Sequence, residues 1–262
     1  MKLPSDGRFW PIGSVELSHN RDLPVLSMTG KDEIILKTAD ALINGTATTD
    51  MIQSCIPNIK NAWDMPRIDL DAILIAIRIA SYGDKLDVDV KCPKCQTVDS
   101  YEADLHYLME NIHLPDYNHS LNINGIYLNF KPQSYAQYNK ASLESFEQRR
   151  LVTQLTTADF PEQERAKQMK DIIKRVTEIN VIQLTDNIES ILIGDSKVIE
   201  RAMIEEFLQN TDLETFTAIK NKINELNASY KMPNMRVHCK NCQHEFESSI
   251  ELDPATFFAP GS

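Results

Sequence analysis

Two copies of a Cys-x-x-Cys motif lie 147 residues apart and constrain this chain more than any other feature. They are Cys92-Pro93-Lys94-Cys95 and Cys239-Lys240-Asn241-Cys242, and they contain four of the five cysteines. A structural Zn²⁺ takes four ligands in a tetrahedron, and a two-residue spacer lets one tight turn direct two thiolates at the same ion. A single pair would also fit a redox centre, a disulfide or chance, whereas two pairs favour one shared zinc site.

Apolar residues alternate with polar ones beside each motif. Leu86, Val88 and Val90 precede the first pair in this pattern, and Met235 and Val237 precede the second. The copies also match at equal offsets: Val90 and Val237, Gln96 and Gln243, Leu105 and Leu252. The sequence therefore predicts a strand, knuckle, strand unit used twice, and the predicted ligands of one structural zinc ion are Cys92, Cys95, Cys239 and Cys242. Redox or disulfide pairing of these cysteines is the alternative.

The energetic balance allows the two halves of such a site to be far apart in the chain. Closing a loop of about 150 residues costs roughly 5 kcal/mol, while a structural zinc contributes on the order of 10–16 kcal/mol. His238 and His244 flank the second pair, but four thiolates already complete the shell, so we interpret both as bystanders. Lys91, Lys94 and Lys240 adjoin the thiolates, where cations offset the negative charge of the centre.

The chain is acidic, with a net charge of −11 over 262 residues. Carboxylates surround the first knuckle: Asp84, Asp87, Asp89, Asp99, Glu102 and Asp104. Nucleic-acid binding needs Lys and Arg facing the phosphates, and neither knuckle has such a surface. We therefore expect no nucleic-acid partner and interpret the ribbon as a structural clamp or a protein-docking surface.

Neither a signal peptide nor a membrane span is apparent in the sequence. The first six residues are polar and broken by Pro4. The longest apolar run, Ala72 to Ala80, is too short to cross a bilayer and contains Arg78. We expect a soluble, intracellular protein with no membrane partner, which agrees with reduced, metal-binding cysteines.

The predicted fold is mainly α with a small β zinc ribbon, an α+β architecture. In it a long helical insertion separates the two halves of a discontinuous four-cysteine ribbon. Four segments are expected: an N-terminal arm and helical core (1–85), the first zinc knuckle with a β-hairpin (86–132), the helical insertion (133–231), and the second knuckle with the C-terminal tail (232–262).

Turn and capping signals divide the N-terminal segment. Its first 28 residues, rich in Pro and Gly, predict an ordered arm that ends in a short strand over 23–28. Thr29 with Asp32 is a capping signal for a helix over 31–43, and a second helix starts at Thr48 or Thr49 and ends at Cys55.

A third helix in this segment is predicted to be central and buried. Asp69 is expected to cap it, and Gly83 follows its last residue, Tyr82. Its isoleucines cover most sides, which is typical of a helix inside a core. Arg78 is the exception, and either forms a buried ion pair with a nearby aspartate or faces solvent.

Beyond the first knuckle, the pattern changes from strands to helices. Asn124-Gly125 within the alternating segment 121–128 predicts a β-hairpin. Helices are predicted over 134–154, from near Pro161, from Asp195 or Ser196, and from a capping box at residues 211–214 to a point before Pro233. One apolar stripe at helical spacing, read as core rather than as a partner groove, comprises Ile172, Ile173, Val176 and Ile179.

No pattern indicates catalysis. There is no phosphate-binding Gly-rich loop, and four histidines are scattered without a neighbouring nucleophile: His19, His106, His113 and His119. Cys55 lies between Ile52 and Ile56 and is interpreted as a buried apolar residue. At the other end of the chain, Phe257-Phe258 either inserts into a partner or folds back on the ribbon.

The run from Ile68 to Gly83, followed by the first knuckle, carries a resemblance to a known family. It resembles the baseplate hub assembly proteins of contractile-tailed, T-even-like bacteriophages. In that family an aspartate-containing helix ending in Arg-x-x-Ser-Tyr-Gly precedes a Cys-Pro-x-Cys knuckle. The matching residues here are Arg78, Ser81, Tyr82 and Gly83, with Leu3-Pro4-Ser5 and Gly7 at the start of the chain. The resemblance is most specific over residues 1–100, and the second knuckle and Phe257-Phe258 support it.

The resemblance implies a non-enzymatic late viral protein that helps assemble the hub of the tail baseplate, as a chaperone for a hub subunit. Its partners would be baseplate hub proteins. It would act in the host cytoplasm during assembly, and in the virion baseplate if it remains there. A permanent structural subunit of the baseplate is the first alternative. A zinc-ribbon regulator that binds polymerase or nucleic acid is the second, and the oligomeric state is left open.

Overall fold

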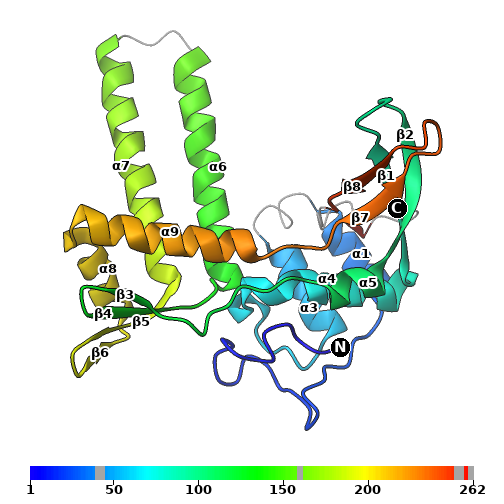
Figure 1. Cartoon of the computed structure of the whole chain (residues 1–262), viewed down its shortest axis with the longest axis horizontal. Coiled ribbons are helices and arrows are strands. Elements are labelled where there is room, and N and C mark those ends of the chain that lie inside the picture. Colours follow the sequence, from blue (N-terminus) through cyan, green and yellow to red (C-terminus); the bar gives the residue numbers. More distant parts are fainter. Residues whose placement is uncertain (39–44, 158–161, 251–256, 259–262) are drawn as a thin grey trace. The chain divides into compact units, whose positions relative to one another are not determined.

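The chain forms two compact units in a computed structural model that describes residues 1–38, 45–157, 162–250 and 257–258 (Figure 1). The first unit comprises residues 1–114 and 229–262, so it is built from both ends of the chain. The second comprises residues 115–228. The division into four segments expected from the sequence stays a prediction.

Unit 1 combines helices with two separate hairpins. Its helices are α1 (Gly30–Leu36), α3 (Thr46–Cys55), the 3-10 helix η1 (Ala62–Asp64), α4 (Arg67–Tyr82) and α5 (Leu105–Glu110). Its strands are β1 (Lys85–Lys91), β2 (Val98–Asp104), β7 (Met235–His238) and β8 (Glu245–Ser248), paired antiparallel as β1-β2 and β7-β8.

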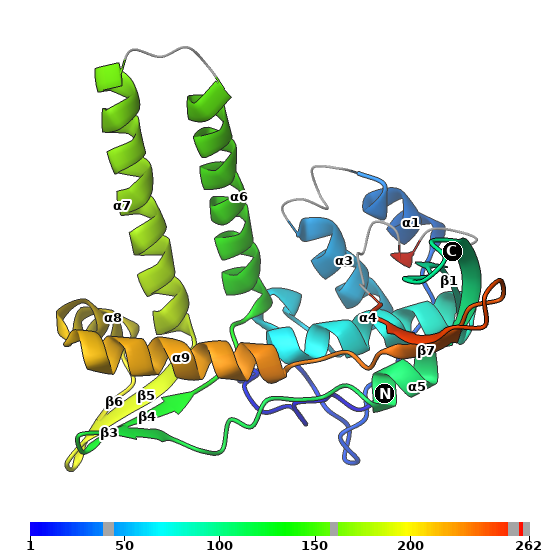
Figure 2. The same ribbon diagram turned by 45° about the horizontal axis from the view of Figure 1, so that its top comes forward.

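Unit 2 is a helical hairpin with a sheet at its base. Its helices are α6 (Tyr135–Thr157), α7 (Glu162–Asp186), α8 (Arg201–Asn210) and α9 (Leu213–Ser229), and its strands are β3 (Leu121–Ile123), β4 (Ile126–Phe130), β5 (Ile188–Ile193) and β6 (Ser196–Val198). Helices α6 and α7 run side by side in opposite directions (Figures 1 and 2). The strands form one antiparallel sheet in the order β3-β4-β5-β6.

The chain leaves and re-enters unit 1 at one backbone bridge. The amide of His113 donates to the carbonyl of Lys231 at 2.8 Å, and the amide of Lys231 donates back at 3.1 Å. Residues 115–228 are therefore inserted between two points of unit 1 that are already joined.

The two short N-terminal helices form close to the expected places. The carboxylate of Asp32 accepts hydrogen bonds from the amide and the hydroxyl of Thr29, both at 2.7 Å, which confirms the capping signal of α1. This helix ends at Leu36, earlier than predicted, and the remainder of the predicted helix (39–43) lies outside the described residues. The second helix, α3, ends at Cys55 as predicted.

The predicted strand over 23–28 is wrong. This part of the arm is held by single hydrogen bonds instead of a ladder: the Leu23 amide donates to the Met1 carbonyl, and the Leu26 amide donates to the Cys55 carbonyl. Within the described residues, the arm shows isolated bridges such as Lys2 to Asp22. It is ordered, but it lacks a partner strand that would make it part of a sheet.

Helix α4 is the buried centre of unit 1, and Asp69 is not its cap. The N-cap is Pro66, and Asp69 lies in the first turn with no exposed surface. Its carboxylate accepts hydrogen bonds from the Ser5 amide (2.7 Å), the Ser5 hydroxyl (2.5 Å) and the Trp10 indole (2.7 Å). Burial raises the pKa of Asp69 to about 6, although these hydrogen bonds oppose the shift. Asp69 thus fastens the N-terminal arm to the core.

The C-terminal end of α4 meets the end of the chain. Gly83 ends the helix with φ 93° and ψ 177°, as the sequence predicted. Arg78 is 2 % exposed, which excludes the solvent-facing alternative. Its guanidinium donates a hydrogen bond to the Phe257 carbonyl and lies over the rings of Tyr82 and Phe257. Phe257 and Phe258 are both buried, so the tail folds back, and its anchor is α4.

The hairpin and helix signals of unit 2 are largely confirmed. Asn124 and Gly125 both have positive φ (50° and 83°) and connect β3 to β4. Ser134 and Gln137 exchange hydrogen bonds at the start of α6, and α7 begins at Glu162, next to Pro161, which lies outside the described residues. At the start of α9 the Asp212 carboxylate accepts from the Thr215 amide, so the cap is Asp212 and not Thr211, the first residue of the predicted capping box.

The helix predicted from Asp195 or Ser196 is wrong. Gly194 and Asp195 form a tight turn between β5 and β6, with Ile193 opposite Ser196. Helix α8 starts only at Arg201. Strand β5 also pairs with β4, so the hairpin of residues 121–130 shares its sheet with a strand that follows α7. The β content is therefore larger than the small ribbon that was predicted.

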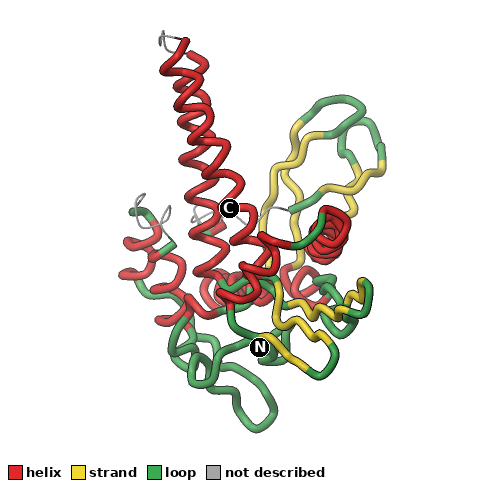
Figure 3. Tube along the Cα trace, turned by 90° about the vertical axis from the view of Figure 1, so that its left-hand side faces the viewer, coloured by secondary structure: helices red, strands yellow, loops and turns green. Residues whose placement is uncertain are grey.

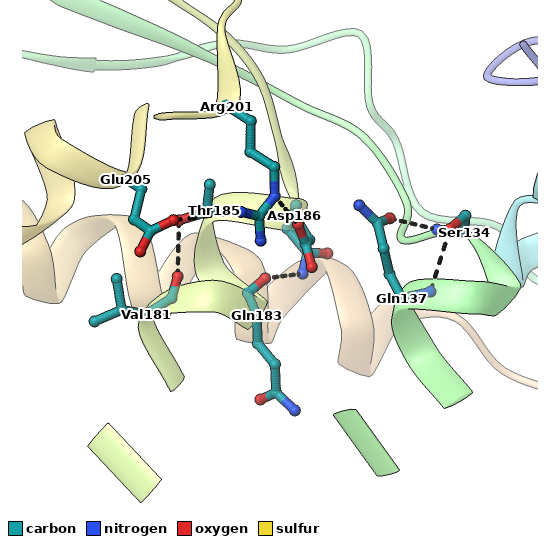
Figure 4. A network of polar contacts seen from close by, with 9 residues as sticks. Ser134, Gln137, Val181, Gln183, Thr185, Asp186, Arg201 and Glu205 are labelled. Carbon is teal, nitrogen blue, oxygen red and sulfur yellow. Dashed lines mark hydrogen bonds and ion pairs between the residues drawn. The ribbon is translucent and has the colours of Figure 1, made fainter. Parts of the chain in front are cut away.

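The apolar stripe of α7 is divided between core and surface. Ile172 and Ile179 are buried, whereas Ile173 and Val176 are exposed, so core packing accounts for half of it. Polar contacts fix the end of this helix: Thr185 donates to the Val181 carbonyl, and Asp186 accepts from Arg201 at 3.0 Å (Figure 4).

Among the described residues, no helix is both long and apolar enough to cross a bilayer.

Candidate metal centre

Two hairpins present the four motif cysteines. Burial alternates along β1 as predicted, which shows that the even positions Leu86, Val88 and Val90 face inward. Strand β1 pairs with β2 over its whole length, from Lys85 opposite Asp104 to Lys91 opposite Val98. Strands β7 and β8 pair in the same manner around the second motif.

The two turns between the strands have the same geometry. The Gln96 amide donates to the Cys92 carbonyl at 2.9 Å, and the Gln243 amide donates to the Cys239 carbonyl at 3.0 Å. Both glutamines have positive φ, 63° and 59°. The left-handed residue reverses the chain directly after the second cysteine, so both sulfurs of a motif lie on one side of the turn. The glutamine match between the two copies was the sequence signal of this repeat.

The four sulfur atoms converge on one point. They all lie within 4.8 Å of one another. The Sγ atoms of Cys92 and Cys242 are 3.7 Å apart, and those of Cys95 and Cys239 are 3.6 Å apart. A zinc–sulfur bond of about 2.3 Å in a tetrahedron requires sulfurs about 3.8 Å apart, so the cluster fits a four-thiolate zinc ion. The separations are too long for disulfides, and all five cysteines are free.

The electrostatics of the cluster also favour a cation at its centre. A hydrogen bond with Thr97 lowers the pKa of the Cys95 thiol to about 5. A hydrogen bond with the backbone of His244 lowers the pKa of the Cys242 thiol. Burial and the neighbouring thiols of Cys95, Cys239 and Cys92 outweigh this effect and raise the pKa of Cys242 to about 12. Thiolates this close together repel one another, and a cation at the centre of the cluster would balance their charge.

The second knuckle also contacts the first hairpin directly. The Lys240 ammonium donates to the Ser100 carbonyl at 2.7 Å and lies over the Tyr101 ring, while the Lys240 amide donates to the Tyr101 hydroxyl at 3.3 Å. Asn241 donates to the Thr97 hydroxyl at 3.2 Å. Figure 3 shows these hairpins as neighbouring strands (yellow). Lys240 therefore joins the two hairpins, a role that its charge alone did not indicate.

The flanking histidines have other partners. His238 Nε2 lies 2.9 Å from the Glu245 carboxylate across the β7-β8 ladder, and the His244 ring stacks on Phe246. Thr97 and Tyr101 contribute to the centre in ways that sequence analysis missed. In the sequence both look like ordinary strand residues, and their role depends on the second knuckle, which packs against them only in the fold.

The remaining candidate residues lie apart from this cluster. His19, His106 and His119 are exposed, and His113 serves the backbone bridge to Lys231. Cys55 is buried in α3, and burial raises the pKa of its thiol to about 12, so it has little thiolate at neutral pH.

A family model described as T4 bacteriophage base plate protein matches residues 14–259 of this chain. The match covers both knuckles, α4 and the whole of unit 2. Searches of curated proteins and of solved structures found no match.

Proposed function

The chain belongs to the family of T4 bacteriophage base plate proteins, and from this membership we propose that it is a non-enzymatic assembly factor for the baseplate hub. Its role would be that of a chaperone for a hub subunit. The observation that supports this proposal most is the convergence of four cysteine sulfurs from the two ends of one unit. Such a closed shell stabilises a framework and leaves no coordination position for catalysis.

The proposed cofactor is one structural Zn²⁺ held by Cys92, Cys95, Cys239 and Cys242 in a discontinuous zinc ribbon. The two hairpins and their matching turns support this assignment. When bound, the ion would tie β1-β2 to β7-β8 and so connect the two chain segments of unit 1. Lys240 and Asn241 would orient the second hairpin on the first before the metal binds.

Proteins are the partners that the surface charge favours. One face of the β1-β2 hairpin carries four carboxylates, those of Asp87, Asp89, Glu102 and Asp104, against two lysines, Lys85 and Lys91, of which Lys85 forms an ion pair with Glu102 at 2.8 Å. These carboxylates would repel a phosphate backbone, so we propose no nucleic-acid partner. Other phage baseplate proteins, and a hub subunit in particular, are the partners that family membership supports.

Co-expression with each hub subunit of the same phage tests the proposal. An assembly factor is expected to co-purify with one subunit and to keep it soluble. Cys239→Ser should weaken this complex through unfolding, whereas Cys55→Ala, outside the cluster, should preserve it. Failure of every hub subunit to form a complex with the folded, zinc-loaded protein would contradict the proposal.

A permanent structural subunit of the virion is the second candidate, and the description of the family as a base plate protein favours it. Quantitative mass spectrometry of purified virions separates the two. A structural subunit would appear in fixed stoichiometry with other baseplate proteins. An assembly factor would be abundant in the host cytoplasm and nearly absent from virions.

A further inference from the structure

A cavity of about 490 Å³ lies in unit 2, between α6, α7 and α9. Its volume is within the range of sites that bind small molecules or single side chains. Every residue that lines it belongs to the described part of unit 2, so the cavity is contained in one unit. Polar contacts fix the ends of α6 and α7 that form its base: Ser134 exchanges hydrogen bonds with Gln137 (Figure 4), and the Asn187 side-chain amide donates to the Gln183 carbonyl at 2.7 Å.

The charges at this cavity are unusual for so acidic a chain. Arg149 and Lys220 are the only charged residues in its lining. Both are exposed, and neither forms an ion pair with a carboxylate of the described residues. A net charge of −11 repels anions at long range, so a cationic cavity attracts them only locally. The lining therefore favours a ligand whose negatively charged group enters the cavity and comes close to Arg149 and Lys220.

Beside these two cations, the polar lining carries amide side chains, whose N–H groups can donate to such a group and whose carbonyl oxygens can accept. Gln133 Nε2 is buried and has no hydrogen-bond partner among the described residues. Side-chain amides of Asn180, Asn224 and Asn227 also line the cavity. A buried N–H group without a partner costs free energy, which a ligand oxygen would recover. A carboxylate supplies acceptors for the guanidinium and the ammonium. Gln133 precedes the first residue of α6, about 20 Å along the helix from Arg149, so its amide would donate to a different oxygen of the same ligand.

Apolar surface lies beside these donors. Tyr138, Leu184, Phe216 and Ile223 line the same cavity. A free inorganic anion would leave this surface in contact with water, whereas an acidic residue next to an apolar one would cover it. The chain also belongs to a family of proteins that assemble with other proteins. The occupant that fits both the donors and the apolar wall is a peptide segment.

We propose that this cavity is a docking site for an acidic segment of a partner protein, whose Asp or Glu carboxylate binds Arg149 and Lys220 and whose backbone carbonyl accepts from Gln133. The site serves an assembly factor and a permanent subunit equally, so it does not depend on the proposed function. It adds a receptor for one partner segment in unit 2, separate from the cysteine cluster of unit 1.

The test starts with a display library of short random peptides panned against the zinc-loaded full-length protein. The selected peptides are expected to be enriched in Asp or Glu beside an apolar residue. One of them is then synthesised together with its Asn or Gln counterpart, and both are titrated by fluorescence anisotropy near physiological salt. The acidic peptide should bind at least about tenfold more tightly than its amide counterpart.

Three variants locate the binding. Arg149→Gln and Lys220→Gln should each weaken binding of the acidic peptide by about tenfold. Ser145→Tyr, which fills the cavity without changing its charge, should abolish binding. Arg150→Gln is the matched control, because Arg150 is the exposed neighbour of Arg149 and does not line the cavity. Circular dichroism confirms that each variant is folded.

Several results would overturn the proposal. One is the selection of peptides without acidic enrichment, and another is equal loss of binding in Arg149→Gln and Arg150→Gln. A third is saturation by inorganic phosphate or a phosphopeptide with no response to carboxylate peptides, which would identify a phosphate site instead. All three measurements use this protein with peptides or phosphate and without any hub subunit. Their outcome is therefore independent of whether a hub subunit co-purifies.

Discussion

The Sγ atom of Cys95 lies 3.6 Å from that of Cys239, although 144 residues separate them in the sequence. Neither hairpin pairs with the other, and each is a sheet of two strands. Such small sheets are marginally stable alone. Their stability therefore depends on further contacts, among which the cysteine cluster and the hydrogen bonds of Lys240 and Asn241 join one hairpin to the other.

Metal analysis should find about one zinc ion per chain, and replacing one ligand should remove it. Cys239→Ser is expected to lower the free energy of unfolding by at least about 3 kcal/mol, because structural zinc contributes several times that amount in small domains. Atomic absorption and chemical denaturation measure the two effects. Cys55→Ala should retain its zinc. Two ions per chain, or none in the reduced wild-type protein, would contradict a shared site.

The stability of unit 1 should depend on the protonation of Asp69. Its pKa is raised to about 6 in the folded state, so the folded protein binds this proton more tightly than the unfolded chain does. The stabilisation is present below the unfolded value near 4 and is lost as the pH rises through 6, by about 3 kcal/mol over the whole window.

Comparison with Asp69→Asn isolates this effect, because the neutral amide does not titrate. The excess stability of the wild type over the variant should grow by about 1 kcal/mol when the pH is lowered from 7 to 5. Urea denaturation at each pH measures it. Asp87→Asn, at an exposed position of β1, is the matched control. A difference between the wild type and Asp69→Asn that does not change with pH would show that Asp69 is not the titrating group.

Replacing Gly83 is expected to destabilise the protein because of its backbone conformation alone. It adopts φ 93° and ψ 177°, and an added Cβ would meet no atom within 4 Å. Gly83→Ala should therefore cost about 1–3 kcal/mol through strain, without any clash. Gly30→Ala, in α1 and equally uncrowded, should be neutral or slightly stabilising. Thermal unfolding of the two variants tests this prediction. Equal melting temperatures for Gly83→Ala and Gly30→Ala would refute the strain argument.

The C-terminal phenylalanines should stabilise the protein even without a partner. Phe258 is 5 % exposed, and Phe→Ala at a buried site costs about 3–5 kcal/mol. Phe258→Ala should accordingly lower the free energy of unfolding of the isolated chain by about 3 kcal/mol. Ile12→Ala, at a fully exposed site, should have almost no effect. An unchanged stability in Phe258→Ala would mean that the tail is held for a partner instead.

Signals carried within a few residues predicted the local structure well. The cysteine spacing, Asn124-Gly125 and Gly83 each specify a turn whose geometry depends little on the rest of the chain. Asp69 shows where such reasoning fails: its position suggests a cap, but Ser5 and Trp10, distant in sequence, take its carboxylate. Long-range partners of this kind have no sequence signature.

The other errors have identifiable physical causes. Asp195 resembles a helix start, yet Gly194-Asp195 between Ile193 and Ser196 is a turn signal between strands, and the short continuous apolar run at 191–193 before it is consistent with a buried strand. The cavity lined by Arg149 and Lys220 could not be predicted, because its lining comes from three helices whose packing is set only in the fold.

The bridge between His113 and Lys231 has a consequence for how the chain tolerates change. Two backbone hydrogen bonds hold the exit and the re-entry of the chain side by side, so the backbone of unit 1 is closed at this point. Residues 115–228 can therefore vary in length or sequence without separating the two chain segments of unit 1, which makes this bridge a point where an insertion is tolerated.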